Sequence, residues 1–271
     1  MRRRLPSGLR RTVVPLVLAL AATLTGMPVA QAAQPTSPPV DYVALGDSYA
    51  AGVGAAPDGT SGVCARSDAS YPARYAAATV PASFLSVACS GATTAGVLRD
   101  QVSAVTKDTD LVTITVGGND TGFAPVLARC TTAPDDAGCD QAVRTGERVA
   151  RYVLPSALAV VLGAVHVRAP DARVVVLGYP RLFGDGPGCP LNPVRSARLD
   201  AGADVLNDRI ADTARRFGAT FVDVRPAFTG HGLCSADPWI VAPGGPGAYH
   251  PTAPGYARGY VPALGASTGA A

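Results

Sequence analysis

Short apolar runs rich in β-branched residues recur along the chain, separated by stretches with helical periodicity. Continuous apolar runs of this length are typical of strands buried on both faces of a parallel sheet. Strands that alternate with helices indicate a layered α/β domain. The pattern predicts strands over 40–46, 83–88, 111–117, 173–178 and 219–224, and helices over 72–79, 94–105, 140–166, 193–217 and from about Thr252.

Four long segments between these elements show no periodicity, and each contains cysteine: 54–70, 129–140, 181–192 and 229–249. Such segments in a compact domain are usually functional or cross-linked, and the cysteines favour cross-linking. The chain has six cysteines without the short Cys or His spacing of a zinc site, so we expect disulfides and no metal. Many connectivities are open, but the closest pair encloses a short polar loop. We therefore favour pairing in sequence order: Cys64–Cys89, Cys130–Cys139 and Cys189–Cys234.

The first 32 residues have the pattern of an export signal. Five arginines precede an apolar run over 13–24, and the segment ends in Ala30-Gln31-Ala32. The run is shorter than the about 20 residues that span a bilayer, which favours a cleaved signal over an uncleaved anchor. Arg10-Arg11 fits either a twin-arginine signal or an ordinary basic start, so the export route stays open. We expect an export signal over 1–32, a flexible Pro-rich leader over 33–39 and a single domain over 40–271.

Charge argues against a nucleic-acid partner. The chain has 23 basic and 20 acidic side chains, a net charge of +3, but five of the basic residues and no acidic ones lie in the first 32 residues. Without that segment the net charge is −2, and phosphate binding needs an accumulated basic face. No later stretch is long and apolar enough for a membrane anchor, so we expect a secreted, extracellular protein. We also expect this protein to be a monomer.

Ser48 follows the first expected strand directly, in Gly46-Asp47-Ser48-Tyr49. Ligands of open α/β sheets bind beyond the carboxyl ends of the strands. A serine at this turn can project both its hydroxyl and its backbone N–H into that crevice, as a nucleophile requires. The alternative is that Ser48 only caps the following helix.

Gly91 and Asn119 follow the second and third expected strands. Gly91 offers a backbone N–H without a side chain to block an anion, although it could also be an ordinary glycine turn. The Asn119 amide is a neutral donor suited to a developing oxyanion, although asparagine is also a common cap and turn residue.

Three histidines are candidate bases. His166 ends the long expected helix. A positive charge at a helix C-terminus interacts favourably with the helix dipole, which is a sufficient structural reason for a histidine there. His231 lies in a Gly-rich loop beside a cysteine and is interpreted as a loop anchor. His250, before Pro251 near the C-terminus, is the candidate that can reach the crevice.

No acid lies in the three residues before His250, although a catalytic triad uses a carboxylate to orient the imidazole. We therefore predict a Ser-His dyad in which the Gly247 carbonyl accepts from Nδ1–H, and keep Asp237 as the carboxylate alternative.

These residues resemble the SGNH hydrolases, also called the GDSL esterases and lipases. Gly-Asp-Ser-Tyr over 46–49 is similar to the first block of that family, Ser90-Gly91 to the second, Gly-Gly-Asn-Asp over 117–120 to the third, and His-Pro-Thr over 250–252 to the last. The larger class of serine hydrolases fits worse, because Ala50 stands where its nucleophile motif has a second glycine.

The resemblance implies a three-layer α/β/α sandwich with a central parallel sheet of about five strands. It implies Ser48 as nucleophile, His250 as base, and an oxyanion hole of the Ser48 N–H, the Gly91 N–H and the Asn119 side chain. Tyr49 replaces the family's Leu, at a position outside the chemistry, and Gly247 replaces its usual Asp, which supports the dyad. The cysteines resemble those of a secreted, disulfide-bonded bacterial subgroup in which such dyads occur.

The expected function is hydrolysis of carboxylic, fatty-acyl esters through an acyl-enzyme, on a small-molecule or lipid substrate and without a cofactor. The Gly-rich segments 54–70 and 181–192 are expected to line the acyl pocket. A carbohydrate acetylesterase using the same site is the alternative within enzymes, and a non-catalytic secreted binding module is the alternative outside them.

Overall fold

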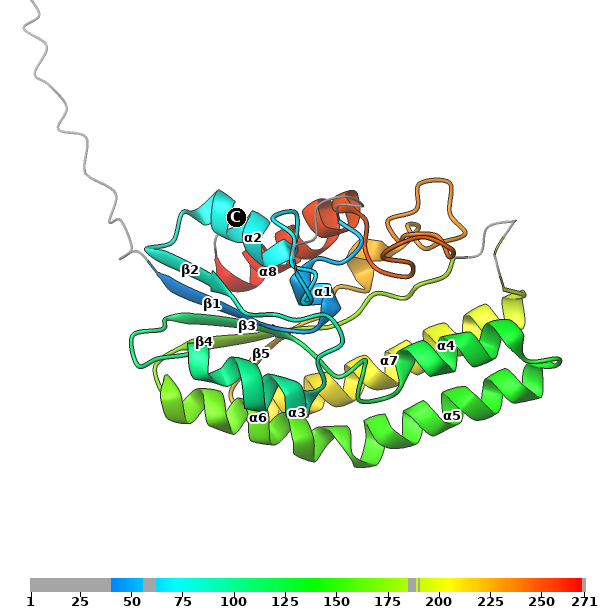
Figure 1. The fold of residues 1–271 in the computed structure, drawn as a ribbon, viewed down its shortest axis with the longest axis horizontal. Coiled ribbons are helices and arrows are strands. Elements are labelled where there is room, and N and C mark those ends of the chain that lie inside the picture. Colours follow the sequence, from blue (N-terminus) through cyan, green and yellow to red (C-terminus); the bar gives the residue numbers. More distant parts are fainter. Residues whose placement is uncertain (1–39, 56–61, 185–188, 190, 270–271) are drawn as a thin grey trace, which may run out of the picture. The chain divides into compact units, whose positions relative to one another are not determined.

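Five parallel strands form one sheet at the centre of the chain (Figure 1). The computed structural model describes residues 40–55, 62–184, 189 and 191–269. The strand order is β2-β1-β3-β4-β5, and every neighbouring pair is parallel. The strands are β1 (Asp41–Gly46), β2 (Ser83–Ser86), β3 (Leu111–Thr115), β4 (Arg173–Leu177) and β5 (Thr220–Val222).

The strand order creates a crevice where the chain changes direction across the sheet. After β1 the chain adds β2 on one side, and then β3, β4 and β5 on the other. Ligands of such sheets bind at this switch point, beyond the carboxyl ends of the strands on either side of it. The segments that follow β1 and β3 contain Ser48 and Asn119, so the topology brings these two turns to one edge.

Helices cover both faces of the sheet, which gives the three-layer α/β/α sandwich expected from the resemblance (Figure 1). One layer contains α2 (Tyr71–Thr79), the π-helical turn η4 (Gly255–Tyr260) and α8 (Val261–Thr268). The other contains α3 (Thr94–Gly96), η1 (Val97–Gln101), η2 (Val102–Ala104), α6 (Leu154–Arg168) and α7 (Pro193–Arg216). The short α1 (Ser48–Ala51) follows β1, and η3 (Pro226–Phe228) follows β5. Helix α4 (Phe123–Thr132) packs against α5 (Asp136–Tyr152), and α5 packs against α7.

Four fully buried tyrosines fill the layer between the sheet and the helices of α2 and η4: Tyr42, Tyr71, Tyr256 and Tyr260. The rings of Tyr71 and Tyr260 are stacked with their centroids 5.1 Å apart. Each hydroxyl is hydrogen-bonded, to Thr113, Thr115, the Val53 carbonyl and the Gly178 carbonyl, respectively. This bonding matters because an unpaired hydroxyl in such a core costs about 1–3 kcal/mol.

Two expectations from the sequence are wrong between β3 and β4. The segment expected as a loop over 129–140 is mostly helical, because α4 extends to Thr132 and α5 begins at Asp136. The single helix expected over 140–166 is two helices, α5 and α6, bent by 44° at a break. Pro155 lies in the first turn of α6, where proline's missing N–H has no helical partner to lose.

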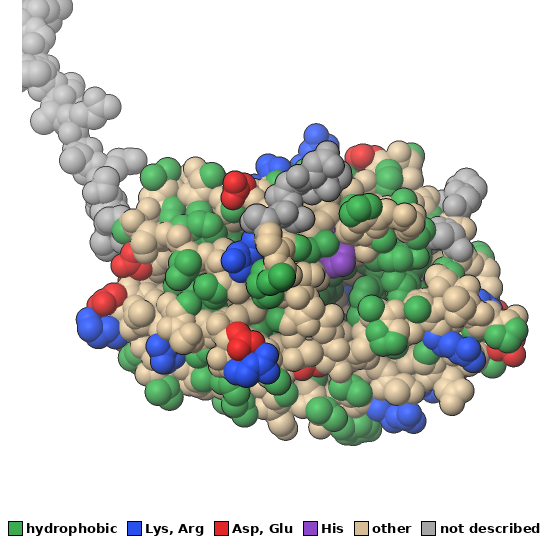
Figure 2. All heavy atoms as spheres, viewed as in Figure 1, with side chains coloured by type: hydrophobic (Ala, Val, Ile, Leu, Met, Phe, Trp, Pro, Cys, Tyr) green, Lys and Arg blue, Asp and Glu red, His purple; other side chains and the backbone are tan. Residues whose placement is uncertain are grey.

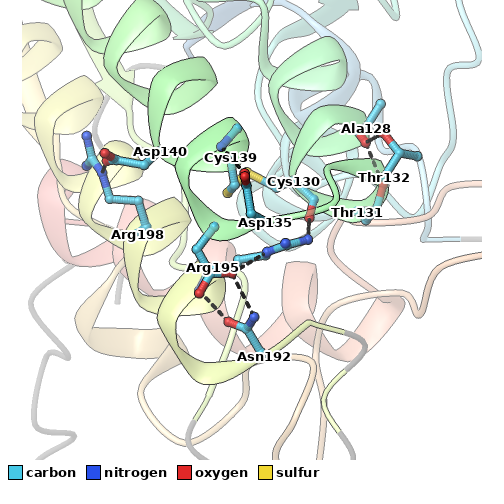
Figure 3. The surroundings of a disulfide bond; sticks show 12 residues. Ala128, Cys130, Thr131, Thr132, Asp135, Cys139, Asp140, Asn192, Arg195 and Arg198 are labelled. Atoms are coloured by element: carbon cyan, nitrogen blue, oxygen red, sulfur yellow. Dashed lines mark hydrogen bonds and ion pairs between the residues drawn. A yellow bond between two sulfur atoms is a disulfide. The ribbon is translucent and has the colours of Figure 1, made fainter.

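The six cysteines form the three disulfides favoured in sequence order: Cys64–Cys89, Cys130–Cys139 and Cys189–Cys234. The second joins the last turn of α4 to the first turn of α5 (Figure 3). Beside it, Arg195 of α7 donates to the Cys130 carbonyl at 2.8 Å and to Asp136 at 2.7 Å. The disulfide and the arginine together tie the three helices at one end.

The expected export signal and leader lie outside the described residues. Within the described ranges, no single helix has the length and hydropathy to cross a bilayer, and only the bent pair of α5 and α6, taken together, reaches them. Residues 40–269 fall within one compact unit.

Candidate active site

The turn after β1 holds Ser48 in a tightly bonded backbone. Gly46 has a φ of +133°, and a Cβ there would lie 2.4 Å from the Thr115 carbonyl oxygen, so only glycine fits. The Gln101 side chain accepts from the Gly46 N–H at 2.7 Å and donates to its carbonyl at 2.9 Å. Asp47 caps α1 by accepting from the Tyr49 N–H at 2.9 Å. Because Asp47 is the cap, the Ser48 hydroxyl is available for another contact.

That contact is with His250. Ser48 Oγ lies 2.8 Å from His250 Nε2. His250 Nδ1 lies 3.0 Å from the Ala248 carbonyl oxygen and 3.3 Å from the Gly247 carbonyl oxygen. Carbonyl oxygens only accept, so Nδ1 carries the proton and Nε2 accepts from the serine hydroxyl. Gly247 is thus one of two backbone acceptors, and Ala248, which the sequence did not indicate, is the nearer.

The turn that ends at His250 is hydrogen-bonded to Val241. The Val241 N–H donates to the His250 carbonyl at 2.8 Å, and the Tyr249 N–H donates to the Val241 carbonyl at 2.9 Å. Tyr49 donates its hydroxyl to the Tyr249 carbonyl at 2.8 Å, and its ring centroid lies 5.0 Å from that of His250. Tyr49, interpreted from sequence as outside the chemistry, therefore packs against the imidazole.

Burial is the main influence on the pKa of His250. It lowers the pKa of the imidazole below its ordinary value, and the hydrogen bonds from Nδ1 to Ala248 and Gly247 act in the opposite direction. The histidine is therefore neutral at pH 7, as a group that accepts a proton must be.

The other residues considered as alternatives lie elsewhere. Asp237 accepts from the Trp239 indole N–H at 3.2 Å, and its carboxylate lies 3.4 Å from His231 Nδ1. Within the described part of the chain, no carboxylate is hydrogen-bonded to His250. The His231 ring stacks on Trp239 at 3.6 Å, in agreement with the loop-anchor interpretation, and His166 is exposed in the last turn of α6.

Gly91 and Asn119 line the same cavity as Ser48. Gly91 is exposed with a φ of +81°, and the space where its Cβ would be is open to at least 4 Å. Asn119 Nδ2 donates one hydrogen to the Ala92 carbonyl at 3.0 Å, which holds the amide beside the Gly91 loop. The amide has a second hydrogen for another acceptor.

Cross-links hold these two turns together. Thr94 donates its N–H and hydroxyl to the Asp120 carboxylate, which joins the loop after β2 to the turn after β3. Cys89, bonded to Cys64, directly precedes Ser90, whose N–H donates to the Cys64 carbonyl at 3.0 Å. The disulfide therefore fixes the loop that carries Gly91.

A largely apolar cavity of about 420 Å³ begins at Ser48 and His250. The space-filling view shows a hollow bordered by hydrophobic side chains and a histidine (Figure 2). Helices α4, α5 and α7 supply most of its lining, among others Phe123, Leu127, Val143, Ala150, Leu199 and Leu206. Segments 54–70 and 181–192 were expected to line the pocket. Among their described residues only Leu182 does so, and for the others the expectation is wrong.

Besides Asp47, two carboxylates on the helices line the cavity, Glu147 and Asp200. Glu147 pairs with Arg198 at 2.5 Å. Asp200 accepts from the N–H groups of Leu182 and Phe183 at 2.9 and 3.2 Å, and burial raises its pKa to about 6. Over the described ranges, no group of three or more His, Cys, Asp or Glu residues could hold a metal ion.

Comparisons with known proteins show the family to which this chain belongs. Residues 44–258 match the GDSL-like lipase/acylhydrolase family. Lipase 1 of Streptomyces coelicolor is 43% identical over 92% of this chain and 94% of its own length, and a lipase of Streptomyces rimosus is 43% identical over 95% and 97%. The chain belongs to the GDSL-like lipase/acylhydrolase family. It is a carboxylic ester hydrolase.

Two solved structures that are 43% identical to this chain agree with this assignment. A phospholipase A1 from Streptomyces albidoflavus and an extracellular lipase from Streptomyces rimosus each match with a TM-score of 0.80 at 43% identity. Each match covers 84% of this chain and 99% of the other. An acetyl-xylooligosaccharide esterase, at 16% identity and a TM-score of 0.52, shares the fold.

Proposed function

We propose that this chain is a secreted esterase or lipase that hydrolyses fatty-acyl esters through a Ser48–His250 dyad and an acyl-enzyme. One observation carries the proposal: Ser48 Oγ lies 2.8 Å from His250 Nε2 at an apolar cavity of about 420 Å³. A nucleophile within hydrogen-bond reach of its base is the arrangement that acyl transfer needs.

In the first half of the reaction, His250 Nε2 takes the hydroxyl proton as Ser48 Oγ attacks the ester carbonyl. The tetrahedral intermediate collapses, His250 returns the proton to the departing alcohol oxygen, and the acyl group remains on Ser48. Water then attacks the acyl-enzyme, with the same imidazole as base, and the carboxylic acid leaves.

The negative oxygen of the intermediate requires donors that are already in place. The Ser48 N–H, the Gly91 N–H and the Asn119 side chain supply them in this proposal, and all three residues line the cavity. Donors fixed before the reaction need little reorganisation as charge develops, which makes this usually the largest single contribution to catalysis.

His250 works here without a carboxylate partner. The Ala248 and Gly247 carbonyls hold the Nδ1–H tautomer, which is one of the two roles of the acid in a triad. They carry no full charge, so they stabilise the imidazolium less than a carboxylate does. In compensation, the neutral histidine requires no counter-charge in its half-buried position.

The size of the cavity favours esters with long acyl groups over acetyl esters. A methylene group occupies about as much space as a water molecule, about 30 Å³. The cavity volume of about 420 Å³ therefore has room for roughly a dozen methylene groups. Each methylene that leaves water contributes about 0.8 kcal/mol. An acetyl group would leave most of this apolar surface unused, so the carbohydrate acetylesterase is the weaker alternative.

A phospholipid is a second candidate substrate, because a relative that is 43% identical is a phospholipase A1. The extracellular relative at the same identity, the three disulfides and the basic-apolar start of the chain support export. We propose that the mature enzyme acts as a monomer without a cofactor.

The test is a series of p-nitrophenyl esters from acetate to palmitate, with phosphatidylcholine vesicles as a separate substrate. We expect kcat/KM to rise from acetate to medium or long chains and Ser48→Ala to abolish turnover. Turnover that survives in Ser48→Ala, or no turnover by folded wild type on any ester, contradicts the proposal. A preference for acetate would favour the acetylesterase.

A further inference from the structure

Tyr179 lies two residues beyond β4, and its side chain reaches across the sheet edge to the two turns of the candidate site. Its hydroxyl donates to the Asp47 carboxylate at 2.5 Å and accepts from the Gly118 N–H at 3.1 Å. Asp47 directly precedes Ser48, and Gly118 directly precedes Asn119. One phenol oxygen thus joins the turn after β1 to the turn after β3.

Tyr179 is itself held on both sides of its backbone. Asn207 of α7 accepts from the Tyr179 N–H and donates to the Tyr179 carbonyl, both at 2.8 Å. Asn207 is fully buried and Tyr179 is 6% exposed. Because the backbone of Tyr179 is fixed in this way, its hydroxyl is a rigid reference point for the two turns.

The ring of Tyr179 also contacts Tyr49, which packs against the His250 imidazole. Its centroid lies 5.0 Å from that of Tyr49, in an edge-to-face arrangement, and Tyr49 in turn packs on His250. Gly118 faces the Tyr179 ring so closely that a Cβ there would lie 3.4 Å from it. The Asp47 N–H also donates to the Thr115 carbonyl at 2.9 Å, so this side chain adds a second link between the two turns, beyond the end of the β1–β3 pairing.

We propose that Tyr179 is a positioning residue that sets the distance between the Ser48 nucleophile and the Asn119 oxyanion donor. This inference rests on the proposed function of those two residues. Burial raises the pKa of Asp47 to about 7, and the hydrogen bond from Tyr179 opposes that rise, so the contact also stabilises charge next to the nucleophile.

Tyr179→Phe tests the proposal, because it removes both hydrogen bonds and keeps the ring. We expect kcat to fall by about 10- to 100-fold, since a misplacement of about 1 Å can cost this much, with KM changed by less than about two-fold. Esters are assayed with the mature wild type and variants, and folding is followed by circular dichroism.

Tyr42→Phe is the matched control. Tyr42 is, like Tyr179, a buried tyrosine with a hydrogen-bonded hydroxyl, which contacts Thr113 at 2.8 Å, but it lies in β1 away from the site. We expect Tyr42→Phe to lower the melting temperature by an amount similar to Tyr179→Phe and to leave kcat unchanged. Equal kcat in the two variants would overturn the inference.

A double-mutant cycle separates positioning from a general structural effect. If Tyr179 acts through Asn119, Tyr179→Phe must cost less in an Asn119→Ala background than in wild type. Fully additive losses would contradict this route. If Tyr179→Phe does not fold, Asp47→Ala, which removes the acceptor of the Tyr179 hydroxyl, decides: an unchanged kcat in that variant would also overturn the inference.

The two proposals fail in different ways. Wild-type turnover that does not depend on Ser48 removes the proposed function, whatever Tyr179→Phe does. Ser48-dependent turnover that Tyr179→Phe leaves at the level of Tyr42→Phe removes only the positioning role.

Discussion

Asp47, rather than Ser48, caps the helix that follows the first strand, and this division of tasks leaves the serine hydroxyl for His250. The cost is a carboxylate that is 1% exposed. Its two donors, the Tyr49 N–H and the Tyr179 hydroxyl, meet part of that cost. The turn after β1 therefore places a buried acid directly before the proposed nucleophile.

Asn119→Ala should lower kcat by roughly 10²- to 10³-fold, because one oxyanion donor is lost. The fold should persist, since the exchanged side chain makes one hydrogen bond, to the Ala92 carbonyl. Steady-state kinetics on a p-nitrophenyl ester and a thermal unfolding curve check both parts. A loss of less than about three-fold would exclude Asn119 from the oxyanion hole.

The kcat/KM of the wild type should stay high to a lower pH than an unperturbed histidine allows. The base must be neutral, and burial lowers the pKa of His250 below the ordinary 6.5, so activity should fall only below that pH. A pH profile of kcat/KM measures the inflection, with Asp47→Asn as control for the other buried acid of the turn. An inflection above 6.5 that persists in the control would contradict the assignment.

The residues with recognisable chemistry could be predicted from sequence, and those that support them could not. Ser48, Gly91, Asn119 and His250 stand directly after strands or in short motifs. Gln101 and Asn207 act through long-range contacts with Gly46 and Tyr179, and nothing in their local sequence distinguishes them from surface residues.

At the scale of elements, the strands were predictable because each is a short, continuous apolar run between polar segments. Helix α4 was not, because the segment over 129–140, which contains Cys130 and Cys139, was interpreted as a cross-linked loop. Pro125 is tolerated because it lies in the first turn, where N–H groups have no helical partner. Because α4 was not predicted, its contribution to the lining of the cavity could not be predicted either.

Small residues on α5 and α7 leave room for that cavity. Gly146, Ala150, Gly202 and Ala203 all line it. A Cβ at Gly202 would lie 2.9 Å from Val143 Cγ1, so the two helices already approach closely at this point. We infer that the depth available to an acyl chain is set by these positions.

Ala203→Phe should shift the preference of the enzyme toward short esters. The added ring enters the cavity, and a few methylenes of lost contact are worth at least about 10-fold in kcat/KM for long-chain substrates. The kcat/KM for acetate or butyrate should change little. Ala201→Phe, at an exposed position of the same helix, is the control, and an identical chain-length profile in both variants would contradict the placement of the acyl group.

For the whole molecule, Asp47 links stability to pH. Its pKa is about 7 in the folded state against an ordinary 3.8, so the protonated form favours folding. The stabilisation is complete below pH 3.8 and is lost as the pH rises through 7. Urea unfolding at about pH 5 and about pH 8 should show a larger loss of unfolding free energy in wild type than in Asp47→Asn. Equal losses would show that Asp47 is ionised throughout.

The hydroxyl of Ser48 and the imidazole of His250 are separated by 202 positions in the sequence. Four of the five strands, β2 to β5, and most of the helices lie between them in the sequence. A nascent or truncated chain that lacks its final segment would thus hold the nucleophile without its base. If the proposed dyad is correct, a growing chain acquires esterase activity only after it has been extended as far as His250.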